Sequence, residues 1–352
     1  MLSEVAGSTQ AEQSGPFFYV MNKKRFSGCL IGQCLGDALG FPVEGFPPRV
    51  CQSYVEKYLT GSILKMPGRG GFRFGQYTDD SQLARELMLS YVERQGFDPQ
   101  DYARRIAAIF KENRIVGRGH ATDQAARRLA AGVPWQEAGT PSPSAGNGSA
   151  MRAAPIGLFF YDSPEELIKA ADDQGRITHA DRRCSAGAVA IAGCVAMALK
   201  GQAHQENWLK RIAEWAAVID EAFGQHILQL REWVTLPPED AVVPISKCGV
   251  DPDYQDAWEG ISPFVVGSVL WSLYSFLRNP ENYMEAIRTA IALGGDVDTT
   301  AAMTGAISGA YLGIDSLPSG LAHQVTDQGM WGYSDLVDLA HHCYEVKLGE
   351  AS

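Results

Sequence analysis

Glycine recurs at every fourth position from Gly28 to Gly40, and this repeat constrains the fold of the chain more than any other feature. Residues four apart lie on the same face of a helix, so the repeat predicts a helix with a bare glycine face. Glycine weakens a helix by about 1 kcal/mol relative to alanine, and a close approach of another backbone would offset that cost. Ala301, Gly305, Gly309 and Gly313 repeat the same spacing. The sequence therefore predicts close helix contacts in the centre of a bundle.

Helical patterns account for most of the remaining chain, and the sequence predicts an all-α fold. Apolar residues recur at helical spacing in the segments 81–95, 102–113, 123–131, 181–200 and 299–312. Clusters of Pro, Gly and Asp predict loops at 66–76, 139–149 and 236–262, and no run alternates as a β-strand would. Because the motifs described below are far apart in sequence, we expect a single domain over residues 25–352.

Charge and composition exclude several classes of function. The formal net charge of −11 and the pI near 5.1 leave no overall basic surface, so nucleic acid is not expected as a partner. The longest run of small apolar residues, 186–199, falls short of the roughly 20 needed to cross a bilayer. The seven cysteines are scattered and suggest reduced, buried thiols. With no signal peptide evident, we expect a cytoplasmic protein that does not bind membranes.

Residues 1–24 have the composition of a flexible N-terminal arm. The arm is polar apart from the aromatic patch Phe17–Met21. Such a patch could dock onto a partner, or it could fold back onto its own domain, and the second outcome is the more common for apolar patches.

Two acidic motifs stand at predicted helix starts: Thr78-Asp79-Asp80, and Asp296-Val297-Asp298-Thr299. Asp and Thr often cap helices, but this density of carboxylates exceeds what capping needs. Mg²⁺ and Mn²⁺ prefer oxygen ligands of this kind. If both motifs meet in space, they can hold two divalent cations about 3.5–4 Å apart, an arrangement that activates water for hydrolysis.

Two glycine-rich segments supply backbone N–H groups that could hold a phosphate. They are Gly146 to Arg152, and the turn Gly117-Arg118-Gly119-His120. Neither matches a nucleotide-binding fingerprint, and a plain turn is the more common explanation for each segment, because Gly and Asn often form turns. His179, just before the small-residue helix, fits either a packing role or a ligand contact.

Taken in order, these motifs resemble those of the ADP-ribosylglycohydrolase family. The matching segments are 26–40, Tyr77-Thr78-Asp79-Asp80-Ser81, 146–152, Ile177-Thr178-His179 and 293–301. The resemblance implies an all-α hydrolase with two Mg²⁺ or Mn²⁺ ions. The metal ligands that it implies are Thr78, Asp79, Asp80, Asp296, Asp298 and Thr299.

The resemblance also implies roles in catalysis and substrate binding. Asp80, Asp298 and Glu44 would be the catalytic residues, with Glu44 on a loop near the metals. The ADP-ribose cleft would be lined by Gly117, Gly119, His120, Gly146, Asn147, Gly148, Ser149, Met151 and His179.

We expect the substrate to be ADP-ribosylated protein, with arginine as the favoured acceptor. Serine-linked or small-molecule ADP-ribose derivatives stay open as substrates, as do a pyrophosphate-cleaving hydrolase and a non-catalytic, crystallin-like protein on the same scaffold. Some relatives use an N-terminal extension to plug an ADP-ribosyltransferase toxin. The patch Phe17–Met21 therefore suggests an immunity protein that binds a cognate toxin.

Overall fold

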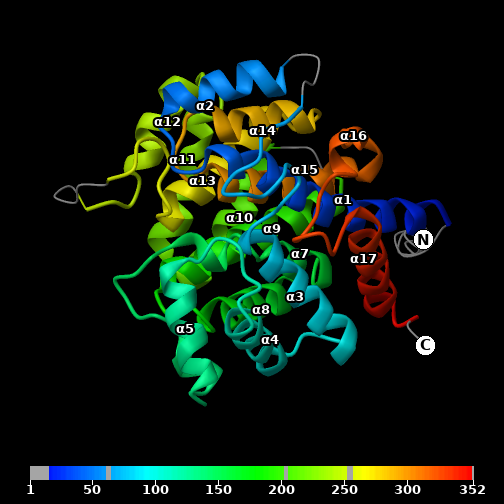
Figure 1. Cartoon of the computed structure of the whole chain (residues 1–352). Coiled ribbons are helices and arrows are strands. Elements are labelled where there is room, and N and C mark those ends of the chain that lie inside the picture. Colours follow the sequence, from blue (N-terminus) through cyan, green and yellow to red (C-terminus); the bar gives the residue numbers. More distant parts are fainter. Residues whose placement is uncertain (1–15, 61–64, 202–204, 252–256, 351–352) are drawn as a thin grey trace, which may run out of the picture.

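The computed structural model describes residues 16–60, 65–201, 205–251 and 257–350, and these residues form one body of packed helices (Figure 1). In this part of the chain the extended pairings are isolated bridges, such as Gln76 with Thr326, and no sheet forms. The all-α prediction is confirmed.

Helices α1 (Pro16–Gly40) and α15 (Val297–Leu312) pack against each other across the middle of the molecule (Figure 1). Their glycine faces meet in antiparallel register: Gly28 lies opposite Gly309, and Gly32 lies opposite Gly305. A Cβ atom at Gly32 would overlap the carbonyl oxygen of Gly305 and lie 3.2 Å from the Cα of Gly309. The two glycine repeats therefore bring the backbones of α1 and α15 into direct contact.

The expected boundary between arm and domain falls inside α1, because this helix begins at Pro16. Residues 1–15 and the side chains of the patch Phe17–Met21 lie outside the described residues. The helix beyond the patch is tied to the rest of the protein: Lys23 pairs with Glu345 at 3.0 Å, and Arg25 Nη1 donates to the carbonyl of Leu199 at 2.7 Å.

Helix α9 (Arg182–Leu199) is the small-residue helix that the sequence predicts near 181–200, and it lies in the core. Its apolar composition comes from alanine, glycine and valine, which let the neighbouring helices approach closely. Within the described residues, this helix alone is long and apolar enough to cross a membrane. The protein itself buries 89% of it.

Three further helices place the site, and each begins slightly before its predicted start. They are α3 (Asp79–Arg94), α4 (Pro99–Lys111) and α5 (His120–Ala130). A buried ion pair between Arg85 Nη1 and Asp327 Oδ2, 2.7 Å apart, anchors α3 to the C-terminal part of the chain. Gln82 adds to this anchor, because its side chain donates to Asp327 and accepts from the backbone N–H of Val116.

The remaining helical elements cover these central helices. Their bounds are η2 Phe41–Val43, α2 Pro48–Tyr54, the π-helical turn η3 Val55–Leu59, α6 Trp135–Ala138, η4 Asn147–Ser149, α7 Ala154–Phe159, α8 Pro164–Arg176, α10 Gln205–Ile219, α11 Glu221–Trp233, α12 Pro238–Lys247, α13 Val265–Arg278, α14 Tyr283–Ala292, η5 Ile314–Ser316, α16 Ser319–Ala322 and α17 Tyr333–Leu348.

The loop predicted over 236–262 was wrong for its first part, because α12 lies there. Pro238 occupies the first turn of this helix, where the missing N–H of proline costs nothing, and Glu239 and Asp240 follow it. Pro237 and Pro238, which suggested a loop, therefore start a helix.

Candidate metal centre

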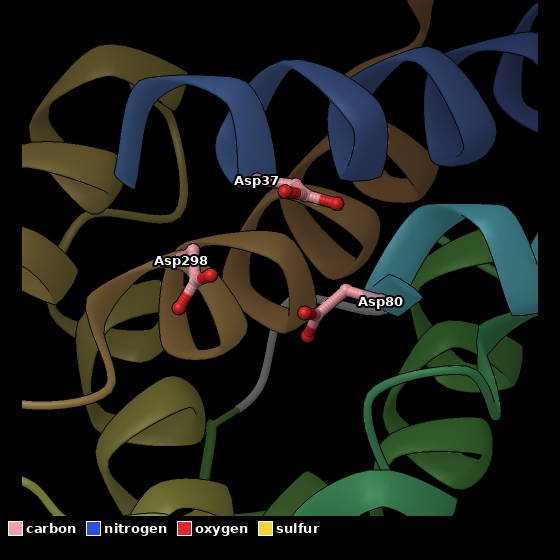
Figure 2. Close-up of side chains that lie close together, drawn as sticks. All are labelled: Asp37, Asp80 and Asp298. Atoms are coloured by element: carbon pink, nitrogen blue, oxygen red, sulfur yellow. The ribbon is translucent and has the colours of Figure 1, made fainter. Parts of the chain in front are cut away.

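Carboxylates from three helices converge on one buried space. Asp37 comes from the last turns of α1, Asp80 from the first turn of α3, and Asp298 from the first turn of α15 (Figure 2). Each offers an oxygen, and the three oxygens lie within 4.8 Å of one another. A second trio, Glu44, Asp296 and Asp298, meets the same criterion. Asp298 belongs to both trios, so the two groups of carboxylates that could hold a metal ion are joined through this residue.

Asp37, to which the sequence analysis gave no role, holds the start of α3 in place. Its carboxylate accepts hydrogen bonds from the backbone N–H of Thr78 at 2.9 and 3.0 Å, and from that of Ser81 at 3.2 Å. The Ser81 hydroxyl donates to it at 2.6 Å. Burial raises the pKa of Asp37 to about 7, although these hydrogen bonds oppose the increase. Asp37 thus fixes the motif that carries Asp79 and Asp80.

Thr78 is buried, and its hydroxyl links two of the carboxylates. Its Oγ1 is 3.0 Å from Asp37 Oδ1 and 2.9 Å from Asp80 Oδ2. The other oxygen of Asp80, Oδ1, is buried without a hydrogen-bond partner among the described residues. A buried carboxylate oxygen with no donor is costly in a protein interior, and a cation would satisfy it. The hard oxygen donors and this orphaned atom therefore fit a divalent metal ion.

The electrostatics of the group support the same interpretation. Burial is the main cause that raises the pKa values of Asp79, Asp80 and Asp298 well above the usual range, and the neighbouring carboxylates raise them further. Burial likewise raises the pKa of Asp296 to about 6. Such a concentration of like charges is stable at neutral pH only when protons or cations neutralise it.

The turn Gly117–His120 lies against Asp79. The backbone N–H of Asp79 donates to the carbonyl of Val116 at 2.7 Å, and a hydrogen bond from the Gly119 backbone lowers the pKa of its carboxylate. Gly117 has a φ of +72°, and a Cβ there would lie 2.8 Å from Asp79 Oδ1. Gly117 and Gly119 therefore shape the acidic site itself, while His120 lines the cleft at the start of α5.

Asn147 connects the glycine-rich segment 146–152 to the second acidic motif. Its Nδ2 donates to Asp296 Oδ2 at 2.6 Å. The backbone N–H of Asp296 donates to the carbonyl of Ile261 at 2.7 Å, and that of Thr299 donates to Asp298 Oδ1 at 2.9 Å. These contacts fix the carboxylates of the second motif at the mouth of α15.

Glu44 enters the site from the loop that follows η2. The backbone holds this loop against the second motif: Gly45 N–H donates to the carbonyl of Gly295, and Gly295 N–H donates to that of Phe46. Arg69 Nη1 lies 3.4 Å from the Glu44 carboxylate and donates to the Glu44 carbonyl at 2.7 Å. Burial raises the pKa of Glu44, and the charge of Arg69 opposes this shift.

A cleft of about 410 Å³ opens over the acidic group. The predicted residues that line it are Glu44, Asp79, Asp80, Gly117, Gly119, His120, Gly146, Asn147, Gly148, Met151, His179, Asp296, Asp298 and Thr299. Thr78 and Ser149 do not line it. Thr78 lies beneath the carboxylates, and the Ser149 hydroxyl instead donates to the carbonyl of Cys184 at 2.9 Å in the interior.

Sequence reasoning missed several further lining residues, among them Thr122 and Trp258. Trp258 also lines an adjacent cavity of about 480 Å³, which shares Ser144, Gly146 and Pro263 with the cleft. A lone tryptophan within the predicted loop 236–262 was the available signal, because an aromatic residue in a polar loop often faces a ligand. Thr122 had no signal beyond its place one turn from the glycine-rich turn.

Comparisons with known proteins identify relatives of the whole chain. The family model described as ADP-ribosylglycohydrolase matches residues 21–351. ADP-ribosylhydrolase ARH3 of Homo sapiens is 30% identical over 350 residues, which cover 92% of this chain and 93% of that protein. ADP-ribosylarginine hydrolase Tri1 of Pseudomonas putida (strain GB-1) is 27% identical over 84% of this chain and 72% of its own length. A solved structure titled "ADP-ribosylglycohydrolase-related protein complex" is 27% identical, with a TM-score of 0.67, and the match covers 93% and 99% of the two chains.

Proposed function

The chain belongs to the ADP-ribosylglycohydrolase family, a family of hydrolases, and on this premise we propose that it releases ADP-ribose from modified protein with the help of two divalent cations. One observation carries the proposal: two trios of carboxylates are joined through Asp298, and all their members except the buried Asp37 line the same cleft. A non-catalytic, crystallin-like role needs no such cluster of buried charge.

The ligands that the family resemblance implies for Mg²⁺ or Mn²⁺ are Thr78, Asp79, Asp80, Asp296, Asp298 and Thr299. Of these, Asp80, Asp296 and Asp298 belong to the carboxylate trios, and Asp79 and Thr299 line the same cleft. When bound, such ions supply positive charge that holds the ribose hydroxyls beside the scissile bond and stabilises negative charge that develops during the reaction. Asp37 supports this set through its hydrogen bonds to Thr78 and Ser81.

The protein's own carboxylates can activate water in this site. A water oxygen attacks the anomeric carbon, and the bond from that carbon to the acceptor breaks. Glu44 is partly exposed at the edge of the cleft, and its raised pKa suits a group that takes the proton from water and passes it to the leaving acceptor. Asp80 and Asp298 keep the ribose oriented while these bonds change.

Arginine is the acceptor that the sequence predicted, and the relative Tri1 is named as an ADP-ribosylarginine hydrolase. A serine acceptor is the second candidate, because the Arg69 guanidinium stands beside Glu44 at the edge of the cleft. A cation there disfavours a second guanidinium on the leaving group, although its partial exposure weakens the repulsion.

The decisive experiment compares arginine-linked and serine-linked ADP-ribosyl peptides as substrates. The wild-type protein, Asp298→Asn and the surface control Asp338→Asn on α17 are incubated with Mg²⁺ or with chelator. We expect intact ADP-ribose from at least one peptide, lost in chelator and in Asp298→Asn but kept in Asp338→Asn. AMP and ribose phosphate as products would instead indicate pyrophosphate cleavage, and no product from either peptide would overturn the proposal.

The immunity role rests on the sequence of the N-terminal arm. Deleting residues 1–21 removes the arm together with the patch Phe17–Met21 but keeps Lys23 and Arg25, which tie α1 to the rest of the protein. If the arm blocks a cognate ADP-ribosyltransferase, the truncated protein will no longer bind that toxin while its hydrolase activity stays unchanged. Undiminished toxin binding by the truncated protein would end this hypothesis.

A further inference from the structure

Arg152, on the segment that follows Gly148, is completely buried, and its guanidinium acts only as a hydrogen-bond donor. Its Nε donates to Gln174 Oε1 at 3.0 Å, and its Nη2 donates to the Gln174 carbonyl at 2.9 Å and to Thr178 Oγ1 at 2.8 Å. A guanidinium carries only donors. The Thr178 oxygen must therefore accept the hydrogen bond from Arg152.

The hydrogen bond from Arg152 determines which group donates in the contact between Thr178 and His179. Its Oγ1 lies 2.8 Å from His179 Nδ1, and both residues are buried. The Thr178 hydroxyl has one proton to place, and Nδ1 is the acceptor that the described residues offer it. If Nδ1 carried a proton instead, two donors would face the Thr178 oxygen and the hydroxyl proton would be buried without a partner, which is costly. Nδ1 is therefore the acceptor.

The imidazole is neutral, so its proton must reside on Nε2. Burial, followed by the charge of Arg152, lowers the pKa of His179 to about 3. A neutral imidazole carries one proton, and the partner of one nitrogen decides which nitrogen holds it. With Nδ1 accepting from Thr178, Nε2 becomes a hydrogen-bond donor.

This donor faces the cleft. His179 lines the cleft with Gly146 and Gly148, and Nε2 makes no hydrogen bond to the described residues. A Cβ at Gly148 would lie 3.1 Å from Nε2, and one at Gly146 would lie 3.6 Å from it. Glycine at both positions therefore keeps the space in front of Nε2 open. Because Nε2 opens onto the cleft and makes no hydrogen bond to the described residues, its N–H suits a ligand oxygen.

We propose that Arg152 and Thr178 are positioning residues that fix His179 as an Nε2–H donor to an acceptor oxygen of the bound ADP-ribose, a phosphate or hydroxyl oxygen. This inference rests on the proposed function for the identity of the ligand. The tautomer, by contrast, is a property of the protein alone. A consequence is that this contact does not require the imidazole to carry a charge.

The first test reads the tautomer directly. Protein labelled with ¹⁵N in its seven histidines gives two-bond proton–nitrogen correlations, and His179→Gln identifies the His179 signals. We expect a pyridine-like Nδ1 and a pyrrole-like Nε2 in the wild-type protein without ligand. The reverse pattern, or a protonated ring at pH 7, would overturn the proposal whether or not ADP-ribose binds.

The second test connects the tautomer to ligand binding. Thr178→Val keeps the shape of the side chain but removes its hydroxyl, and Thr178→Ser keeps the hydroxyl as the matched control. Calorimetry with free ADP-ribose should show about 3- to 10-fold weaker binding for the valine variant, the size of one hydrogen bond, and near wild-type binding for the serine variant. Equal affinities in all three proteins would refute the positioning role. Absence of ADP-ribose binding in the wild-type protein would refute the proposed function, while the tautomer result would stand.

Discussion

Replacing Gly32 by alanine should push α1 away from α15 and disturb the metal centre that these helices carry. The new methyl group would overlap the Gly305 carbonyl oxygen and lie 3.2 Å from the Cα of Gly309. All of these neighbours are backbone atoms, which cannot rotate away as a side chain can. Comfortable contacts need about 3.5–4.0 Å, so the helices would have to separate by about 1 Å.

The expected cost follows from two opposing effects. Overpacking costs up to about 3 kcal/mol, and the better helix propensity of alanine returns about 1 kcal/mol. The net loss of about 2 kcal/mol should lower the Tm by about 3 °C for a chain of this length. Asp37 and Asp298 lie on the two separated helices, so the affinity for Mn²⁺ should fall as well.

Thermal unfolding and calorimetric titration with Mn²⁺ measure both effects. The matched control is Gly320→Ala in α16, where a Cβ meets no atom within 4 Å. The control should unfold at or slightly above the wild-type temperature and bind Mn²⁺ normally. If Gly32→Ala behaved like Gly320→Ala in both assays, the close contact would not be what holds the centre together.

Three other perturbations test separate parts of the structure. Asp37→Asn leaves only one side-chain oxygen to accept the hydrogen bonds from Thr78 and Ser81. The variant should therefore be about 1–3 kcal/mol less stable and should bind Mn²⁺ more weakly. Unchanged Mn²⁺ binding in calorimetry would exclude the supporting role of Asp37. The pKa of His179, about 3 when folded, lies below that of an unfolded histidine, about 6.5, so its contribution to stability is present above pH 6.5 and is lost as the pH falls. Between pH 8 and pH 5 the wild-type protein should therefore lose about 2 kcal/mol more free energy of unfolding than His179→Gln, and parallel denaturant curves would contradict this. All seven cysteines are buried as free thiols, so a thiol reagent at pH 8 should titrate none of them in the native protein and all seven in denaturant; rapid reaction of any thiol in the native protein would show an exposed cysteine.

Residue type and spacing were sufficient to predict the main elements of the acidic site. The motifs at Thr78–Asp80 and Asp296–Thr299 crowd carboxylates at helix starts, and the structure brings them together in one cleft. The glycine repeats predicted close helix contacts, because so many glycines on one helix face need a partner backbone. The prediction did not extend to the pairing of the two repeats, since spacing shows that a face is bare but not which face covers it.

Long-range contacts explain what the sequence could not reveal. Asp37 is one acidic residue in a helix of small residues, and its role appears only when Thr78 and Ser81 are placed against it. Ser149 was expected from the family resemblance to line the cleft, yet its hydroxyl faces the interior. In a 3₁₀ turn, consecutive side chains point in different directions, and the direction of each depends on packing that no local pattern encodes.

The pairing of α1 with α15 also decides when this enzyme can first become active. During synthesis the glycine face of α1 leaves the ribosome long before its partner exists, and at about 5–20 residues per second the intervening chain takes tens of seconds to appear. Throughout that interval both the backbone groove and the acidic residues of α1 and α3 lack their counterparts. A nascent or truncated chain that ends before Asp296 therefore lacks Asp298 and cannot assemble either trio of carboxylates. Hydrolase activity is therefore expected only from chains whose synthesis has passed this point.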